Sequence, residues 1–92
     1  MTNNIELFKE LQARTIDDAA YYVGGNYVAL GSDSWQDVLD AAVKAINSIG
    51  RGRPDRDSLA ILATTAREAA DGYTAEFAAN LRRIAEIADA LA

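Results

Sequence analysis

The chain has 92 residues, of which 50% are hydrophobic and 25% are charged, as is typical of one compact soluble domain over residues 1–92. It contains no histidine and no cysteine, which excludes disulfide frameworks, thiolate or imidazole metal sites and catalytic pairs that rely on histidine. The 14 acidic residues outnumber the 9 basic ones and give a net charge of −5, so direct sequence-specific DNA binding is not expected.

The N-terminal segment lacks the basic region and apolar run of a secretion signal. The longest uncharged stretch, Ala19–Ser32, contains three glycines and three tyrosines, which is unsuitable for a membrane span. The sequence therefore predicts a cytoplasmic protein that does not enter a membrane.

The first predicted element is a helix over Asn4–Ala13. Asn3 can cap its N-terminus while Glu6, three residues on, reaches back to the cap residue, in a variant of the capping box. A short apolar stripe follows, formed by Leu7, Phe8 and Leu11.

The segment of residues 15–31 allows two interpretations. Its apolar residues fit a helix that ends at Gly24. Ala19–Val23 and Asn26–Leu30 also fit two strands joined by a two-glycine turn, which suits the geometry of tight hairpins. We favour the hairpin, in which Tyr22 faces Tyr27 across the strands.

The third element is a helix that begins at the cap residue Ser34 and ends at Gly50. Its apolar residues recur at helical spacing and predict one amphipathic face. They are Trp35, Val38, Leu39, Ala42, Val43, Ile46 and Ile49.

A loop over residues 50–57 follows, in which Pro54 breaks the helix and Asp55 or Asp57 caps the next one. Two further helices are predicted on either side of Gly72, packed as an antiparallel pair; a single helix through Gly72 is the alternative. Their buried stripes are Leu59, Leu62, Ala63, Ala66 and Ala70, and then Phe77, Leu81, Ile84, Ala88 and Leu91. The expected fold is α+β and helix-dominated, with about four helices and one short β-hairpin; the alternative is a small all-α bundle.

Three carboxylates, Asp33, Asp37 and Asp40, recur at i, i+4 and i+7 and would share one helix face. Hard cations such as magnesium bind carboxylates, but negative charge is also favoured in the first turn of a helix by the helix dipole. No phosphate-binding glycine loop or calcium-loop pattern accompanies these residues. We therefore expect no metal, no cofactor and no enzymatic activity, and we interpret the face as solvated.

The loop arginines Arg51, Arg53 and Arg56 are the only concentrated positive charge. They alternate with Asp55 and Asp57, so the simpler interpretation is a nearly neutral loop in which these groups pair. The alternative is contact with an RNA backbone or an acidic partner, which the fork geometry of arginine suits.

The segment YYVGGNYVALGSDSW followed by DVLDAAVKAI, together with size, acidity and helix-plus-hairpin make-up, resembles small phage-encoded anti-CRISPR proteins that block type I surveillance complexes. That class shares no motif, so no residue role is carried over from it. The resemblance implies stoichiometric binding to a basic Cas protein surface, with the guide RNA as a further contact, so that target DNA is blocked.

The expected function is a non-enzymatic inhibitor or regulator that binds a basic protein or ribonucleoprotein complex, toward which a negative surface would steer it. The alternative is a helical regulatory or antitoxin-type module that forms a homodimer through the stripe from Phe77 to Leu91 or another apolar surface. Aromatic and arginine side chains are favoured interface anchors, although the tyrosines would suit a core equally well. The candidate partner-binding residues are Tyr22, Tyr27, Asp33, Asp37, Asp40, Arg51 and Arg53.

Overall fold

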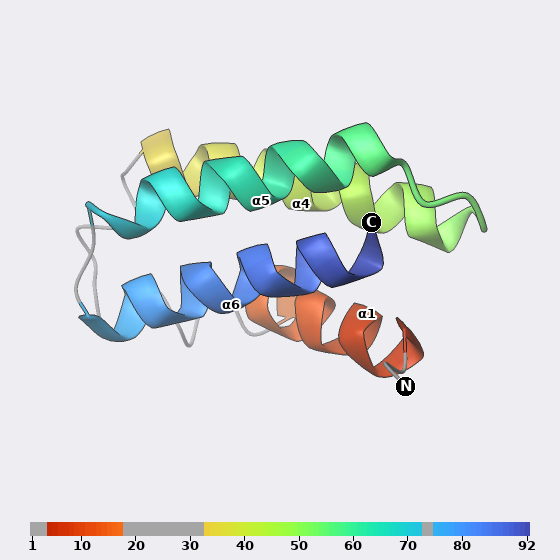
Figure 1. Ribbon diagram of the computed structural model, residues 1–92, viewed down its shortest axis with the longest axis horizontal. Coiled ribbons are helices and arrows are strands. Elements are labelled where there is room, and N and C mark those ends of the chain that lie inside the picture. Colours follow the sequence, from red (N-terminus) through yellow and green to blue (C-terminus); the bar gives the residue numbers. More distant parts are fainter. Residues whose placement is uncertain (1–3, 18–32, 73–74) are drawn as a thin grey trace.

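The structure is a computed structural model that describes residues 4–17, 33–72 and 75–92. In chain order, its elements are α1 (Asn4–Gln12), the π-helical turn η1 (Ala13–Asp17), α4 (Asp33–Gly50), α5 (Arg56–Ala70) and α6 (Ala75–Leu91). Figure 1 shows α5 and α6 side by side, with α4 packed against α5 and α1 packed against α6.

The predicted α+β class is wrong for the described residues, because every element that they form is helical. They make a small all-helical bundle, which was the alternative interpretation of the sequence. Each amphipathic helix buries its apolar stripe against another helix, so this core requires no sheet. The hairpin predicted over residues 19–30, with Tyr22 and Tyr27 on its face, lies outside the described residues.

The α4–α5 connection is fixed by backbone hydrogen bonds at the end of α4. The N–H of Arg53 donates to the carbonyl of Ser48 at 3.2 Å, and the N–H of Gly52 donates to that of Ile49 at 2.9 Å. This pair of bonds is a Schellman motif, and it places Gly52 at φ +80°, in the left-handed region that glycine adopts without strain. The loop therefore leaves α4 in one defined direction.

Asp55 then caps α5, as one of the two predicted cap residues. Its carboxylate accepts hydrogen bonds from the N–H of Asp57 at 3.1 Å and from the hydroxyl of Ser58 at 2.8 Å. The buried hydroxyl of Ser48 donates to the carbonyl of Ala45 at 2.7 Å and accepts from the N–H of Asp55 at 3.0 Å. One side chain of α4 thus anchors the start of α5.

The core confirms the predicted stripes of the last two helices. Helix α5 ends at Ala70 and α6 begins at Ala75, so the alternative of one continuous helix through Gly72 is wrong. The buried residues of the two stripes are Leu59, Leu62, Ala63, Ala66, Ala70, Phe77, Leu81, Ile84 and Ala88, and Leu91 is partly buried. Because these side chains fill the core, the stripe from Phe77 cannot serve as a dimer surface in this fold. Within the described ranges, no helix combines the length and apolar content needed to cross a membrane.

The predicted core face of α4 needs one correction. Val38, Ala42 and Ile46 are buried as predicted, but Val43 is 43% exposed. Ala41 and Ala45 are buried instead. The contact face of α4 is therefore centred on small residues, which allow the backbones of packed helices to approach closely, and Val43 lies at its edge.

Candidate functional site

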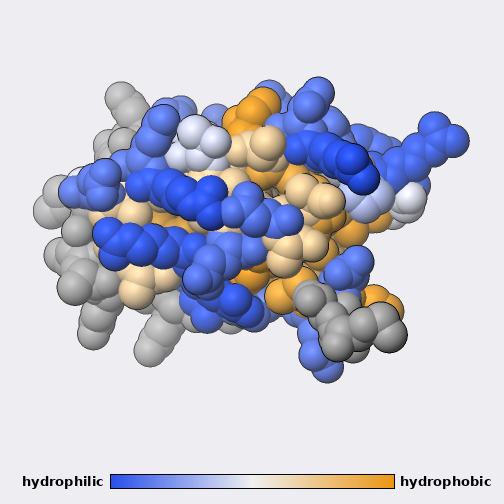
Figure 2. All heavy atoms as spheres, viewed as in Figure 1, coloured by the Kyte–Doolittle hydropathy of each residue, from blue (hydrophilic) through white to orange (hydrophobic). Residues whose placement is uncertain are grey.

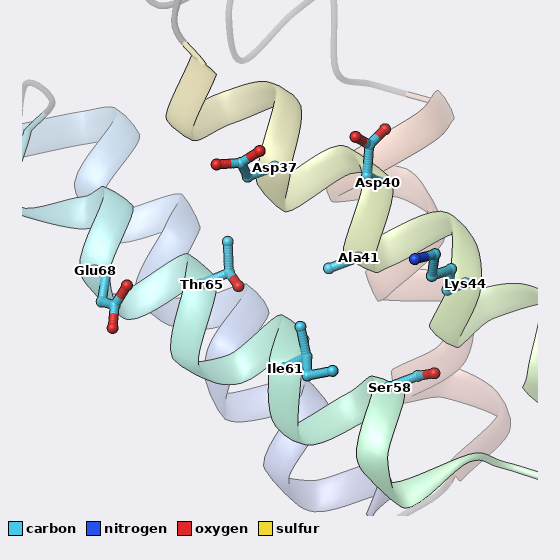
Figure 3. Close-up of a pocket in the computed structure, with 8 residues that line it drawn as sticks. All are labelled: Asp37, Asp40, Ala41, Lys44, Ser58, Ile61, Thr65 and Glu68. Carbon is cyan, nitrogen blue, oxygen red and sulfur yellow. The ribbon is translucent and has the colours of Figure 1, made fainter.

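A groove between α4 and α5 is lined in part by residues predicted to bind a partner. It has a volume of about 300 Å³. Figure 3 shows Ala41 and Lys44 of α4 and Ile61 and Thr65 of α5 pointing toward the space between the two helices. Ile61 is 59% exposed, so an apolar side chain faces solvent in the middle of the groove. The complete lining is Asp37, Asp40, Ala41, Lys44, Ser58, Ile61, Thr65 and Glu68.

The charges of the groove are unevenly distributed. Asp37 and Glu68 lie at one end and Lys44 lies toward the other, while Asp40 points away along the outer side of α4 (Figure 3). The carboxylate of Asp40 accepts a hydrogen bond of 3.0 Å from the amide of Gln36. Among the described residues, no cationic side chain forms a salt bridge with any of these three carboxylates.

The α5–α6 side of the bundle differs, because its arginines have acidic partners. Figure 2 shows this face covered largely by hydrophilic side chains. Arg67 pairs with Asp89, Arg82 lies 4.0 Å from Asp71, and Arg83 binds both Glu10 and Glu86. Among the described residues, Asp71, Glu86 and Asp89 on this side are therefore paired, whereas the carboxylates of the α4–α5 groove form no salt bridge.

The most strongly perturbed carboxyl group, Glu10, serves the fold. Hydrogen bonds from Arg83 and Arg14 lower the pKa of Glu10 from 4.5 to about 2, against the opposing effect of desolvation. Arg14 also donates to the Oδ1 atom of Asn80 at 2.9 Å. Asn80 is 3% exposed, and within the described part of the chain its Nδ2 atom has no hydrogen-bond partner. This cluster joins α1 and η1 to α6.

The predicted site residues do not gather in one place. Asp33 begins α4, and Asp37 and Asp40 line the groove. Arg51 lies beyond the C-terminal end of α4, about 21 Å along the helix axis from Asp37 at 1.5 Å per residue. The acidic and basic candidates therefore occupy separate parts of the α4–α5 pair.

The loop arginines project into solvent rather than pairing as the simpler interpretation predicted. Arg51, Arg53 and Arg56 are all exposed, and within the described part of the chain none forms a salt bridge with Asp55 or Asp57. The carboxylate of Asp55 is occupied by its capping hydrogen bonds. The hydroxyl of Ser58 and the N–H of Asp57 lower the pKa of Asp55, with a smaller contribution from the charge of Arg51.

Sequence reasoning identified Asp37 and Asp40 but missed the other six residues of the groove, which are Ala41, Lys44, Ser58, Ile61, Thr65 and Glu68. Ile61 carried a usable signal, because it is a large apolar residue of α5 that falls outside the buried stripe of Leu59 and Leu62. The other five carried no such signal, and only the packing of α4 on α5 brings them to the groove.

The groove contains hydrogen-bonding, cationic and anionic groups. Across the described ranges, no cluster of three acidic side chains is placed to hold a metal ion. At one end of the groove, Asp37 and Glu68 have no salt-bridge partner among the described residues, and an exposed isoleucine lies beside them, which suits a cationic, partly apolar partner. No protein family, curated protein or solved structure matches this chain.

Proposed function

We propose that this protein is a non-enzymatic inhibitor or regulator that binds a basic protein segment in the α4–α5 groove. The observation that carries the proposal is the pair of carboxylates at one end of the groove, Asp37 and Glu68, neither of which has a salt-bridge partner among the described residues. Unpaired carboxylates attract a cationic partner over long range and then pair with its lysines or arginines.

The size and lining of the groove favour side chains of a protein over a small molecule. Its volume of about 300 Å³ is at the lower limit of ligand pockets, which are usually enclosed and mostly apolar. Ile61 and Ala41 provide a short apolar floor between charged and polar groups. A basic amphipathic helix fits this pattern, because its apolar side chains can cover Ile61 while its cations reach the carboxylates.

The first natural partner to test is a type I surveillance complex, which is the ribonucleoprotein implied by the anti-CRISPR resemblance. Such a complex presents a basic protein surface in the cytoplasm. In this proposal the groove covers that surface and blocks target DNA without chemical change to either partner. The exposed arginines Arg51 and Arg53 lie at the other end of α4 and are available for contact with the guide RNA.

A direct test uses two probes, a purified surveillance complex and a synthetic amphipathic helix that carries arginines beside a leucine stripe. Binding is measured by calorimetry for the unmodified protein and for the variant Asp37→Lys/Glu68→Lys. We expect the variant to bind at least about tenfold more weakly, which corresponds to about 1.4 kcal/mol. Binding of the unmodified protein should also weaken as salt shortens the Debye length below about 10 Å.

The matched control is Asp71→Lys/Glu86→Lys, which changes the net charge equally on the α5–α6 side. Both carboxylates are mostly exposed and form long ion pairs of 4.0 and 3.4 Å, so the fold should tolerate the change. If the control and the groove variant weakened binding equally, the effect would be explained by net charge alone, and the groove would be refuted as the binding site. Absence of binding to both probes would refute the proposed partner class.

A further inference from the structure

We propose that the α4–α5 groove prefers a partner helix that carries a carboxylate as well as cations, and that it discriminates against a uniformly basic helix. This inference rests on the proposed function, because it specifies the chemistry of the partner that the same groove binds. It follows from the position of Lys44, the cationic residue of the groove, which lies toward the end opposite Asp37 and Glu68 (Figure 3).

The charge of Lys44 is available to a partner. Figure 3 shows Lys44 pointing toward the groove, whereas Asp40, one turn before it on α4, points away along the outer side of the helix. The carboxylate of Asp40 accepts a hydrogen bond from the amide of Gln36. Within the described ranges, Lys44 forms no salt bridge with Asp40 or with any other carboxylate.

The spacing of the charges on α4 defines the spacing that a partner helix needs. Asp37 and Lys44 are seven residues apart, which is about 10 Å along the helix axis. A partner cation placed over Asp37 and Glu68 is attracted, but a second cation two turns farther along meets Lys44 and is repelled. A carboxylate at that second position pairs with Lys44 instead. The preferred helix therefore carries its cation and its carboxylate seven positions apart on one face, and Lys44 supplies the repulsion that specificity requires.

The apolar contact does not discriminate between the two kinds of helix. Ile61 is 59% exposed, and together with Thr65 it also lines a second depression of about 260 Å³ on α5. The remaining lining residues of that depression are Ala60 and Thr64, so its lining contains no charged side chain. Apolar side chains of one amphipathic helix can therefore lie on both sides of Ile61, whatever charges the helix carries. The charged residues of the groove then determine which helix is preferred.

The test uses three synthetic helical peptides that share one leucine stripe and one arginine for the acidic end of the groove. They differ only at the position seven residues from that arginine, which is glutamate, glutamine or arginine. Calorimetry with the full chain measures the dissociation constant of each peptide. We expect the glutamate peptide to bind most tightly and the arginine peptide most weakly, with about threefold between successive peptides, the size of a favourable exposed charge pair.

Lys44→Glu should reverse this order, so that the arginine peptide binds most tightly. The same three peptides are compared on both proteins, so differences in their own helicity cancel. Lys44 is exposed, and the variant should remain folded. The matched control is Arg82→Glu, which makes the same charge change at a side chain of α6 that is 61% exposed. It should leave the order of the peptides unchanged.

The variant Asp37→Lys/Glu68→Lys separates this inference from the proposed function. If it weakens binding of the peptides at least about tenfold while Lys44→Glu leaves their order unchanged, the proposed function stands and the inference alone is overturned. An order that Arg82→Glu reverses as fully as Lys44→Glu would also overturn the inference, because net charge would then explain it. If Asp37→Lys/Glu68→Lys weakens binding of none of the peptides, or if the unmodified protein binds none of them, the proposed function fails and the inference fails with it.

Discussion

Glu10 of α1 and Arg83 of α6 are 73 positions apart in the sequence and form a two-point ion pair. The Nε and Nη2 atoms of Arg83 donate to the two carboxylate oxygens of Glu10 at 2.8 and 2.9 Å. The Nε atom of Arg14 donates to one of the same oxygens at 2.8 Å. Forked contacts of this kind fix geometry as well as charge, so they hold the short helix α1 in place on α6.

The first prediction concerns the coupling between Glu10 and Arg83. In a double-mutant cycle of Glu10→Gln and Arg83→Gln, we expect a measurable coupling free energy of unfolding, larger than that of an exposed single-contact pair, because the Glu10–Arg83 pair is bidentate. The matched control is the pair of Arg67 and Asp89, whose side chains are 52% and 54% exposed. Its cycle should give less than about 0.5 kcal/mol in urea unfolding. Equal coupling in the two cycles would contradict the prediction.

The second prediction concerns acid stability. The pKa of Glu10 is about 2 in the folded protein against its ordinary value of 4.5. As pH falls through this interval, the unfolded chain binds a proton at Glu10 before the folded chain does. The contribution of Glu10 to stability is therefore complete above pH 4.5 and is lost as pH falls toward 2.

Glu10→Gln should remove this component of the pH dependence. Urea unfolding of both proteins across the interval should show curves that converge as pH falls, since the other carboxylates titrate equally in each. A difference in free energy that stays constant with pH would mean that Glu10 stabilises the fold without its charge.

The helices were predictable from sequence because each one repeats an apolar stripe and ends at a recognisable signal. The Schellman turn at Gly52 and the cap at Asp55 are local features, so they required no knowledge of the tertiary structure. The rotation of α4 about its own axis, in contrast, depends on tertiary packing and could not be predicted from the local sequence. The spacing of large apolar residues predicted that Val43 lies in the core. In the structure, α4 packs closely through small residues, so Ala41 and Ala45 face inward and Val43 is exposed.

The candidate site was predictable only in part for a similar reason. The i, i+3 spacing of Asp37 and Asp40 indicated a shared region of one helix, but nothing in the sequence paired it with Lys44, Ile61 and Glu68. The Glu10–Arg83 pair could not be predicted either. The two residues are 73 positions apart, and the sequence allows many other pairings of acidic residues with arginines. Contacts between elements depend on helix rotation and crossing, which a single sequence does not specify.

The third prediction compares Ile46 with Val43, two residues of the same predicted stripe. Ile46 is 7% exposed, so Ile46→Ala should lower the free energy of unfolding by about 2–5 kcal/mol through lost burial and a cavity. Val43 is 43% exposed, so Val43→Ala should change it by no more than about 0.5 kcal/mol. Chemical denaturation measures both. Similar losses for the two variants would show that Val43 is buried in solution.

The fourth prediction concerns the alanines that allow α5 to pack closely on the bundle. Ala66 is fully buried, so Ala66→Leu should lower the free energy of unfolding by about 1–3 kcal/mol because three additional carbon atoms must displace well-packed neighbours. Ala60 is exposed on the same helix, and Ala60→Leu should change stability by no more than about 0.5 kcal/mol. Thermal unfolding followed by circular dichroism measures both. If Ala66→Leu were neutral, α5 would have unfilled space beneath it, and close packing through small residues would not explain why Val43 lies outside the core.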